Sequence, residues 1–471
     1  MGRTRPSVLV VGSGLAGLSC ARELASAGWD VLVVSAGHAG RDGATHRVHA
    51  FAPWILLSAP WVRGDSPARF LEDLRRRGLG CERAGLAEVL AENAHATARM
   101  LIEELDLEPI GGEPVALPGD EMPRGLRCAP RDRHAILAPA LARCAAAGVR
   151  FRDRTLALGL LVGEGRAVGA VLVGREDAAL TLAVADAVVM ACGGCGAVFP
   201  VTTSPRWCRG TGLALASAAG VLLHRPGLTQ ALPVTAVPPL FFPGSAALVR
   251  GRVEIGGRTL PADRDLEATT IAVAEGQRAG DEALLEPPPG GVEVIPASLR
   301  ARAPFAGSGQ VPLRVALHHG IGGVAIDSWG RTSLPGLYAC GEAAGGVQGR
   351  RRTLGTGLLE AAIFGTRAGR AAASDGRRDG GRSMRPPEAT APALPVEPGR
   401  LEARLDEIMG PLVMIRPAGE VDAAARELAA WPVRNGAAPD ADAPSAAAAI
   451  RLRAALAMLA GFREDRDRRE R

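Results

Sequence analysis

The sequence predicts an α/β fold in which a parallel sheet flanked by helices carries an inserted α+β capping domain and is followed by a C-terminal helical domain. Three observations predict it. Residues 7–11 form an apolar run that ends at closely spaced glycines, residues 336–341 repeat that pattern over three hundred residues later, and 401–471 shows helical spacing of apolar residues. Apolar runs that end in glycine-rich turns are typical of the carboxyl edge of a doubly wound sheet.

The opening of the chain reads as a compact βαβ unit. Strands are predicted at 7–11 and 30–35, and a helix is predicted at 15–27 between them. Helical spacing then fills 66–106 and returns at 134–148. This order of elements favours a parallel sheet with helices packed on its faces.

The middle of the chain changes from helical to strand-like spacing. Short β-rich runs from 149 to 192, with a turn at 163–166, predict a small meander that feeds a strand at 187–192. A helix is predicted at 210–220, and prolines and irregular pieces follow from about 225 to 310. We interpret this last stretch as an inserted domain that caps a substrate site.

The composition narrows the class of protein. Apolar residues make up 47% of the 471 residues, which is typical of a globular, enzyme-sized protein. The sequence pI is about 9.0, yet all 55 basic residues are Arg and there is one Tyr. Since no aromatic-interleaved basic stripe accompanies the arginines, we interpret the charge as a solvated surface and expect no nucleic-acid partner.

Targeting and redox signals favour the cytoplasm. No segment reaches the roughly 18 uncharged apolar residues that span a bilayer, so we expect no membrane span. The start, Met1-Gly-Arg-Thr-Arg before an apolar run, imitates a secretory signal, but the glycines that follow it argue against that interpretation. Eight cysteines in a chain of this length do not make a disulfide framework, which favours a reducing compartment.

The two glycine-bearing strands together predict a dinucleotide cofactor. Gly12-Ser-Gly14-Leu-Ala-Gly17 follows the first strand and opens a helix, the arrangement that holds a pyrophosphate against helix N-terminal amides. The second strand ends in Gly341-Glu342 and returns to the same crevice, which favours FAD over the shorter reach of NAD. The alternative is that these glycines only permit tight packing.

These patterns divide the chain into five predicted segments. They are the first part of an FAD-binding domain (1–225), a capping domain (226–310), the second part of the FAD-binding domain (311–373), a linker rich in Arg, Gly and Pro (374–400) and a C-terminal helical domain (401–471).

Five stretches in one order resemble the flavoprotein family of L-aspartate oxidase and the fumarate reductase/succinate dehydrogenase flavoprotein subunits. They are the N-terminal turn, Gly80 through Asn93, Ala191 through Gly212, His318 through Asp327, and Gly336 through Gly365. The resemblance runs over most of the chain. It implies a Rossmann-like FAD-binding domain, and the C-terminal helical piece is similar in kind to that of aspartate oxidases.

The resemblance implies which residues contact FAD. It places Gly12, Ser13, Gly14, Ala16 and Gly17 at the pyrophosphate, Gly193 and Gly194 in close approach to FAD, Gly341 and Glu342 at the pyrophosphate and ribityl chain, and Ser35 at the adenosine ribose, where the generic fingerprint has an acidic residue. The helix that starts at Thr356-Gly357-Leu358-Leu359 would aim its amides at the flavin pyrimidine.

The resemblance also implies three substrate residues. Arg264 falls where the family has a proton-transferring arginine, Arg352 where it has a carboxylate clamp, and His318 where a histidine bonds the substrate. Arginine suits a dicarboxylate because its planar fork binds a carboxylate in bidentate fashion and stays charged when desolvated. Each residue also has a non-catalytic interpretation: Arg264 or Arg352 as a solvated surface arginine, and His318 as a structural histidine. Glu121 matches a substrate-shaping glutamate more weakly.

The sequence also departs from the family. The family's substrate histidine near Leu232 is missing, and His46 lies close to where succinate dehydrogenases attach FAD covalently. Cys192-Gly-Gly-Cys195 matches a CxxC pattern, but without a second pair we expect no metal site.

The function implied is oxidation of L-aspartate to iminoaspartate in NAD biosynthesis, by hydride transfer from Cα to flavin N5. Oxygen or another acceptor would reoxidise the flavin, and quinolinate synthase would act downstream. The alternatives are a fumarate reductase or succinate oxidase-like enzyme, and a flavin-binding protein that has lost turnover.

Overall fold

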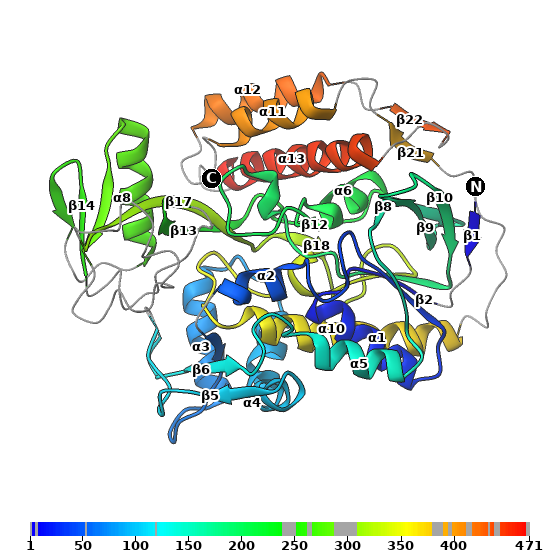
Figure 1. Cartoon of the computed structure of the whole chain (residues 1–471), viewed down its shortest axis with the longest axis horizontal. Helices are drawn as coiled ribbons and strands as arrows, with labels where there is room; N and C mark the ends of the chain where they lie inside the picture. Colours follow the sequence, from blue (N-terminus) through cyan, green and yellow to red (C-terminus); the bar gives the residue numbers. More distant parts are fainter. Residues whose placement is uncertain are drawn as a thin grey trace.

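A five-stranded parallel sheet forms the centre of the computed structural model (Figure 1). Its order is β19-β11-β2-β3-β7, and all neighbours run parallel. The strands are β2 (Val8–Val11), β3 (Val31–Val34), β7 (Arg150–Arg152), β11 (Ala187–Met190) and β19 (Leu337–Ala339). The predicted fold class is confirmed, and β19 joins the first strands through β11 despite its distance along the chain.

The structure describes residues 2–4, 8–51, 54–117, 120–237, 251–260, 266–286, 309–378, 390–393, 398–410, 417–431, 434–437 and 443–467. Statements about contacts below refer to this part of the chain.

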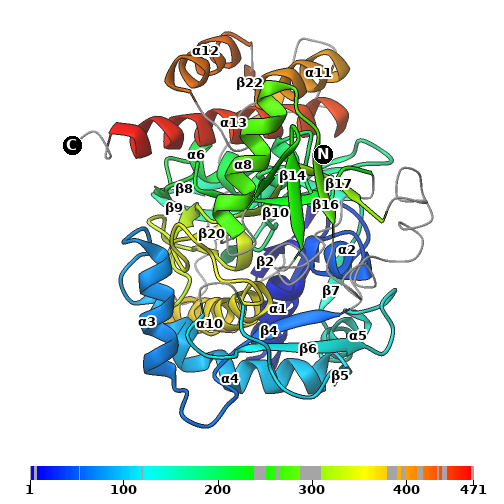
Figure 2. The ribbon, with the colours of Figure 1, turned by 90° about the vertical axis from the view of Figure 1, so that its left-hand side faces the viewer.

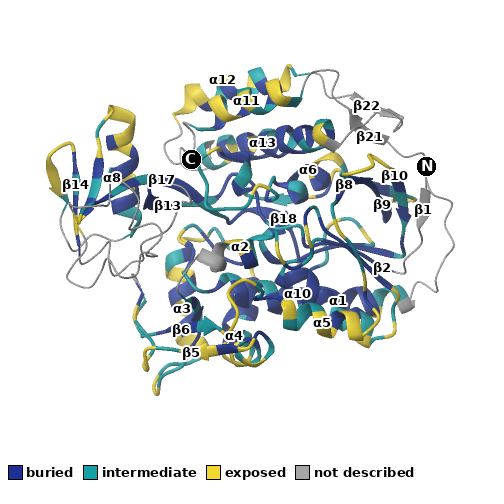
Figure 3. Ribbon diagram, viewed as in Figure 1, coloured by how far each residue is buried: buried dark blue, intermediate teal, exposed yellow. Residues whose placement is uncertain are grey.

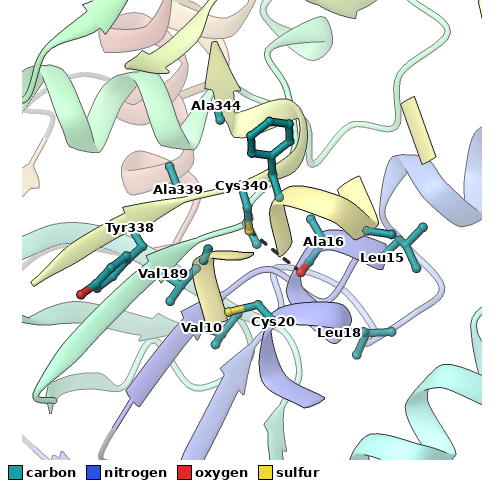
Figure 4. Packing of buried hydrophobic residues seen from close by; sticks show 14 of the residues in the cluster. Val10, Leu15, Ala16, Leu18, Cys20, Val189, Tyr338, Ala339, Cys340 and Ala344 are labelled. Carbon is teal, nitrogen blue, oxygen red and sulfur yellow. Dashed lines mark hydrogen bonds between the residues drawn. The ribbon is translucent and has the colours of Figure 1, made fainter. Parts of the chain in front are cut away.

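Helices α1 (Leu15–Ser26) and α10 (Gly357–Arg378) pack closely beside the sheet. Two glycines of α10 make the approach possible, because a Cβ on Gly365 would lie 2.4 Å from Ala16 O and one on Gly369 would lie 2.7 Å from Cys20 O. Figure 4 shows Ala16, Cys20 and Cys340 together in this core. The small residues of both helices therefore set their spacing. Helix α10 continues to Arg378, beyond the predicted segment end at 373.

Three smaller sheets, one of them formed by β12, β18 and β20, and several helices complete the FAD-binding region. The predicted meander forms β1-β10-β9-β8, and a second sheet has the order β4-β6-β5. The bounds are β1 (Gly2–Thr4), α2 (Ala44–Phe51), β4 (Ile55–Ser58), α3 (Pro67–Gly78), α4 (Leu86–Glu104), β5 (Leu107–Pro109), β6 (Gly125–Pro130), α5 (Ala138–Ala146), β8 (Thr155–Gly163), β9 (Arg166–Gly174), β10 (Leu180–Val184), η1 (Gly196–Val198), α6 (Thr211–Ala218), β12 (Leu223–His224), β18 (Gly323–Ala325), η3 (Gly341–Ala343) and β20 (Ala344–Gly345).

The cap is an antiparallel sheet with one helix against it (Figures 1 and 2). Its strand order is β13-β17-β16-β14-β15, and α8 (Leu266–Ala279) shares a separate hydrophobic core with it. The strands are β13 (Thr229–Thr235), β14 (Arg252–Ile255), β15 (Arg258–Leu260), β16 (Ala283–Glu286) and β17 (Val311–Gly320). Regular strands thus occur where irregular pieces were expected, and β17 belongs to the cap sheet although 311 was expected to begin the second FAD-binding segment.

Three C-terminal helices cover the meander and α6 (Figure 1). They are α11 (Pro398–Met409), α12 (Ala418–Ala429) and α13 (Ala443–Asp467), accompanied by the short strands β21 (Thr390–Ala393) and β22 (Arg434–Ala437). Within the described residues, α13 is long and apolar enough to cross a membrane, but 78% of its apolar window is buried inside the molecule. Figure 3 shows it buried beneath α11 and α12, as a core helix.

Candidate functional site

The glycine turn after β2 brings three elements into contact at the carboxyl edge of the parallel sheet. Gly12 has φ of +114°, and a Cβ there would lie 2.1 Å from Ala191 O. A Cβ on Gly17 would lie 2.0 Å from Gly12 O. Gly14 is the N-cap residue of α1. The N-terminus of α1 therefore opens onto this edge with no Cβ at Gly12 or Gly14, a cradle that fits a pyrophosphate.

Two hydroxyl groups lie beside this turn, where the sequence predicts the ribose contact. Ser13 Oγ donates to Ser35 Oγ at 2.8 Å, and Ser13 Oγ accepts from the N–H of Gly40 at 3.3 Å. Ser35 follows β3, and the carboxylate of Asp153 follows the neighbouring β7, where it accepts from Ala39 N at 3.0 Å. Two serine hydroxyls thus lie at the position where the generic dinucleotide-binding fingerprint has an acidic residue, and the ribose contact of Ser35 stays a prediction.

The second predicted glycine motif meets the first at the same edge. Gly341 has φ of +62°, and a Cβ there would lie 2.7 Å from the Cβ of Ala16. Gly193 also has a positive φ, of +75°, and a Cβ on Gly194 would lie 2.0 Å from Glu342 Oε1. The turns after β2, β11 and β19 therefore converge, as the sequence predicts for a single long cofactor.

Glu342 extends from this convergence toward the cap. Its Oε1 accepts from Gly320 N at 2.9 Å and lies 3.5 Å from His319 Nδ1. Burial raises the pKa of the Glu342 carboxyl to about 7, although the Gly320 N–H and the charge of Arg352 oppose that shift. Glu342 therefore changes charge near neutral pH.

Arg352 is the buried cation of the site, with 7% of its surface exposed. Its Nη1 donates to Gln230 Oε1 at 3.1 Å, and its Nε has no hydrogen-bond partner among the described residues. A Cβ on Gly357, the first residue of α10, would lie 2.5 Å from Nη2. The guanidinium of Arg352 thus lies next to the N-terminus of α10. Both groups carry positive charge, and together they suit a carboxylate ligand.

Gln230 lies on β13 close to Leu232, the position where the family's histidine was expected. Leu232 is buried in β13 with 1% exposure. Two residues earlier, the Gln230 amide accepts from Arg352 and donates back to Arg352 O at 3.2 Å. Sequence reasoning missed this contact because it joins residues far apart in the chain.

The two adjacent histidines of β17 face different partners. His318 Nδ1 lies 2.9 Å from Thr203 Oγ1, whereas the ring of His319 lies beside Glu342 and close to where a Cβ on Gly357 would be. A register shift opposite Gln230 and Ala231 accommodates the pair. Burial, with Arg352 and His318 nearby, holds the pKa of His319 well below its usual value, so its ring is neutral. The substrate role of His318 stays a prediction, and His319 is a site residue that sequence reasoning missed.

The turn that leads into α10 is fixed by a buried polar network. Thr356 Oγ1 donates to Gln348 Oε1 at 2.9 Å, and Gln348 Nε2 donates to Glu360 Oε2 at 2.8 Å. The side chains of Leu358 and Leu359 are buried in the main core, which leaves their amides at the helix N-terminus for a ligand. The cofactor roles of Thr356 to Leu359 stay predictions, and this geometry fits them.

The remaining predicted residues have different outcomes. Arg264 lies outside the described residues. Glu121 is half exposed and lies 3.8 Å from Arg76. Its neighbour Asp120 is half-buried, and its two carboxylate oxygens are shielded from solvent and have no hydrogen-bond partner among the described residues. Burial raises the pKa of Asp120 to about 6, against the opposing charge of Arg77.

The histidine and cysteine motifs add no metal centre to the described part of the chain. No group of three or more His, Cys, Asp or Glu residues is placed there to hold a metal ion, and all eight cysteines are free thiols. Burial raises the pKa of Cys192 to about 12, so its thiol is not activated. His46 is buried in α2, and its Nδ1 has no partner among the described residues.

Comparisons with known proteins identify an FAD-binding family. The model of a family described as FAD binding domain matches residues 7–264 and 300–358. L-aspartate oxidase of Caulobacter vibrioides is 36% identical over 274 residues, which is 52% of this chain and about half (52%) of that enzyme. L-aspartate oxidase of Streptomyces coelicolor is 31% identical over 405 residues, 76% of this chain and 67% of that enzyme.

The fold has a close solved relative. The Mycobacterium smegmatis Sdh1 complex in the apo form superposes with a TM-score of 0.79, at 24% identity, and covers 98% of this chain and 87% of that chain. At this identity the likeness shows the fold alone.

Proposed function

The chain belongs to the family of FAD-binding flavoproteins whose model it matches, and from this premise we propose that it oxidises L-aspartate to iminoaspartate. FAD, when bound, supplies the two-electron acceptor that this oxidation requires. The turns after β2, β11 and β19 meet at the N-terminus of α1, whose amides suit a pyrophosphate. Gly12 and Gly194 permit this close approach, since a Cβ at either would lie about 2 Å from a neighbouring protein atom.

The observation that carries the proposal is the buried guanidinium of Arg352. A desolvated cation with an unpartnered Nε is costly unless a ligand completes its hydrogen bonds. A substrate carboxylate would do so, and the N-terminus of α10 would add to its stabilisation. Arg264 and His318 are proposed to hold or protonate the rest of a dicarboxylate on the strength of their sequence positions.

Asp120 favours an amino acid over a simple dicarboxylate. Its nearby cation, Arg77, donates through Nη2 to Arg352 O at 3.4 Å, which links Asp120 to the turn that carries Arg352. A buried carboxylate without a hydrogen-bond partner suits a substrate ammonium group. We therefore propose that Asp120 contacts the α-ammonium of L-aspartate.

The product suggests a place in metabolism. Iminoaspartate is a reactive imine, and we propose that a downstream enzyme such as quinolinate synthase consumes it in NAD biosynthesis. Oxygen or another acceptor would take the electrons. The eight free cysteines support a reducing cytoplasmic location for this chemistry.

The second candidate function is reduction of fumarate or oxidation of succinate. It is favoured by Arg352, which would bind any of these dicarboxylates. A flavin-binding protein without turnover is the third, and it is favoured by Leu232, which stands where the family has a substrate histidine.

An anaerobic titration of the yellow, FAD-loaded protein separates these functions. Bleaching of the flavin by L-aspartate and not by succinate supports the proposal. Bleaching by succinate supports the second candidate, and bleaching by neither supports the third. The R352Q variant, compared with R350Q in the same turn, tests whether any bleaching depends on the buried guanidinium.

A further inference from the structure

The turn that carries Arg352 rests on the C-terminal end of α3. Arg350 N donates to Gly78 O at 2.9 Å, and Arg351 N donates to Arg77 O at 3.1 Å. A Cβ on Gly349 would lie 2.3 Å from the Cα of Gly78, so the two segments are in close contact. The backbone of this turn is therefore fixed on the side of the FAD-binding region.

The cap reaches the same turn from the other side. The guanidinium of Arg351 forms an ion pair with the carboxylate of Glu267, in the first turn of α8. Glu267 is favourably placed, because an acidic side chain in the first turn of a helix interacts with the helix dipole. The Arg351 side chain is 47% exposed and that of Glu267 is 28% exposed. The ion pair therefore joins α8 of the cap to Arg351, the residue next to the buried Arg352.

The far end of α8 is held by different parts of the molecule. Gln277 Oε1 accepts from Val315 N of β17 at 3.0 Å, and Arg278 pairs with Glu420 of α12 at 2.7 Å. Figure 2 shows α8 extending from the C-terminal helices toward the FAD-binding region. One end of α8 is thus anchored to the cap and α12, and the other meets the Arg352 turn through Glu267.

We propose that Glu267 and Arg351 are positioning residues, whose ion pair fixes the first turn of α8 over the turn that carries Arg352. The proposal rests on the proposed function in one respect, that Arg352 binds a carboxylate of the substrate. The pair acts through its neighbours and touches no substrate itself. Arg351 and Glu267 would set the spacing between the cap and the carboxylate clamp.

The exposure of the pair determines which measurement can reveal it. Half-exposed ion pairs contribute only about 0.2–1 kcal/mol to stability, so unfolding alone is a weak readout. A small displacement of a binding group has a larger effect on the affinity for a ligand that must bridge both parts. Affinity for a dicarboxylate is therefore the appropriate quantity.

Malonate is the probe, because its single methylene group leaves no adjacent carbons to desaturate and no amine to oxidise. Its dissociation constant is measured with the FAD-loaded protein from the flavin spectrum and, independently, from the thermal shift. We expect E267Q and R351Q each to raise the constant by about 3–10-fold, and the double variant E267Q/R351Q to raise it no further than the weaker-binding single variant, because each single change already breaks the pair. R350Q removes the same charge from the adjacent position and should leave the affinity within about 2-fold.

Salt gives a second readout. Raising the NaCl concentration should reduce the difference between wild type and E267Q, because the pair is partly exposed to solvent. Single variants that bind malonate as wild type does, or a double variant in which the two losses of affinity add in full, would overturn the positioning role.

If the wild-type protein binds no malonate, this result counts against the proposed role of Arg352 in binding a carboxylate. It does not test the ion pair between Glu267 and Arg351. A double-mutant cycle on thermal unfolding then decides whether Glu267 and Arg351 interact, and a coupling of zero overturns the proposal.

Discussion

Arg352 concentrates the chemistry of the site in one side chain. Replacement by Gln keeps a donor but removes the charge and the bidentate fork, so we expect kcat/KM for L-aspartate to fall by about 100-fold or more. FAD should stay bound, because Gly12 and Gly341 lie elsewhere on the sheet edge. Stopped-flow reduction of the flavin measures the effect. An R352Q protein within a few-fold of the R350Q control would contradict the role of Arg352.

Asp120 predicts a pH dependence that differs between substrates. Because burial raises its pKa to about 6, the carboxyl is neutral below that pH and charged above it. The KM for L-aspartate should therefore fall as the pH rises through about 6, since only the charged form pairs with the ammonium group. Malonate has no ammonium group for Asp120 to contact, so the pH profile of its dissociation constant should be the same in wild type and in D120N.

The variant D120N tests the same group directly. It should raise the KM for L-aspartate by about 10-fold and remove its dependence on pH near 6, while malonate still binds. An unchanged KM profile in D120N would show that another group contacts the ammonium.

His319 shows why part of the site could not be predicted at the level of residues. Motif spacing selects His318, whereas the contact with Glu342 and the nearby charge of Arg352 involve its neighbour. The register shift in the β13–β17 pair gives the two adjacent histidines different partners, and no local pattern encodes it. Gln230 escaped prediction for a related reason, since its partner lies 122 residues away in the sequence.

The contact between α1 and α10 sets the geometry of the cofactor cradle. G365A would place a Cβ 2.4 Å from Ala16 O, and we expect it to destabilise the protein by about 1–3 kcal/mol. Gly399 of α11 is the matched control, because a Cβ there meets nothing within 4 Å. G399A should stabilise by about 0.4–1 kcal/mol. Thermal unfolding of both variants checks the opposite signs, and equal shifts would contradict this packing.

The elements that carry the cofactor were predictable and those of the cap were not. The strands at 8–11, 31–34 and 337–339 are buried apolar runs, and the first and last of them lead into glycine motifs. This local sequence pattern is enough to predict them. Strands β14, β15 and β16 of the cap have only three or four residues each. The longer strands β13 and β17 include Pro233 and Pro312, which hides their alternation. Whether β17 belongs to the cap or to the FAD-binding region depends on which strands it pairs with. Local sequence does not encode pairing between distant strands.

The C-terminal helices are joined to the FAD-binding region through Arg451 of α13. This side chain is 4% exposed, donates to Val198 O at 3.0 Å and pairs with Glu402 and Asp406. Its removal leaves a buried carbonyl and the Asp406 carboxylate without this partner, and leaves Glu402 paired with Arg209 alone. R451A should therefore destabilise the protein by about 2–4 kcal/mol.

The control for Arg451 lies on the same helix. Arg463 pairs with Asp422 but is 39% exposed, so R463A should cost less than about 1 kcal/mol. Chemical denaturation compares the two variants. Similar losses would mean that burial of Arg451 is not what joins the helices to the rest of the molecule.

At the level of the whole molecule, three distant turns and the cap are expected to enclose one FAD and one dicarboxylate. A crystal structure with FAD and malonate tests this most directly. We predict the pyrophosphate at Gly12 to Gly17, the flavin beside the N-terminus of α10, and a malonate carboxylate roughly 3 Å from Nε of Arg352. Malonate bound elsewhere, or an Arg352 guanidinium that points away from the flavin, would contradict the account.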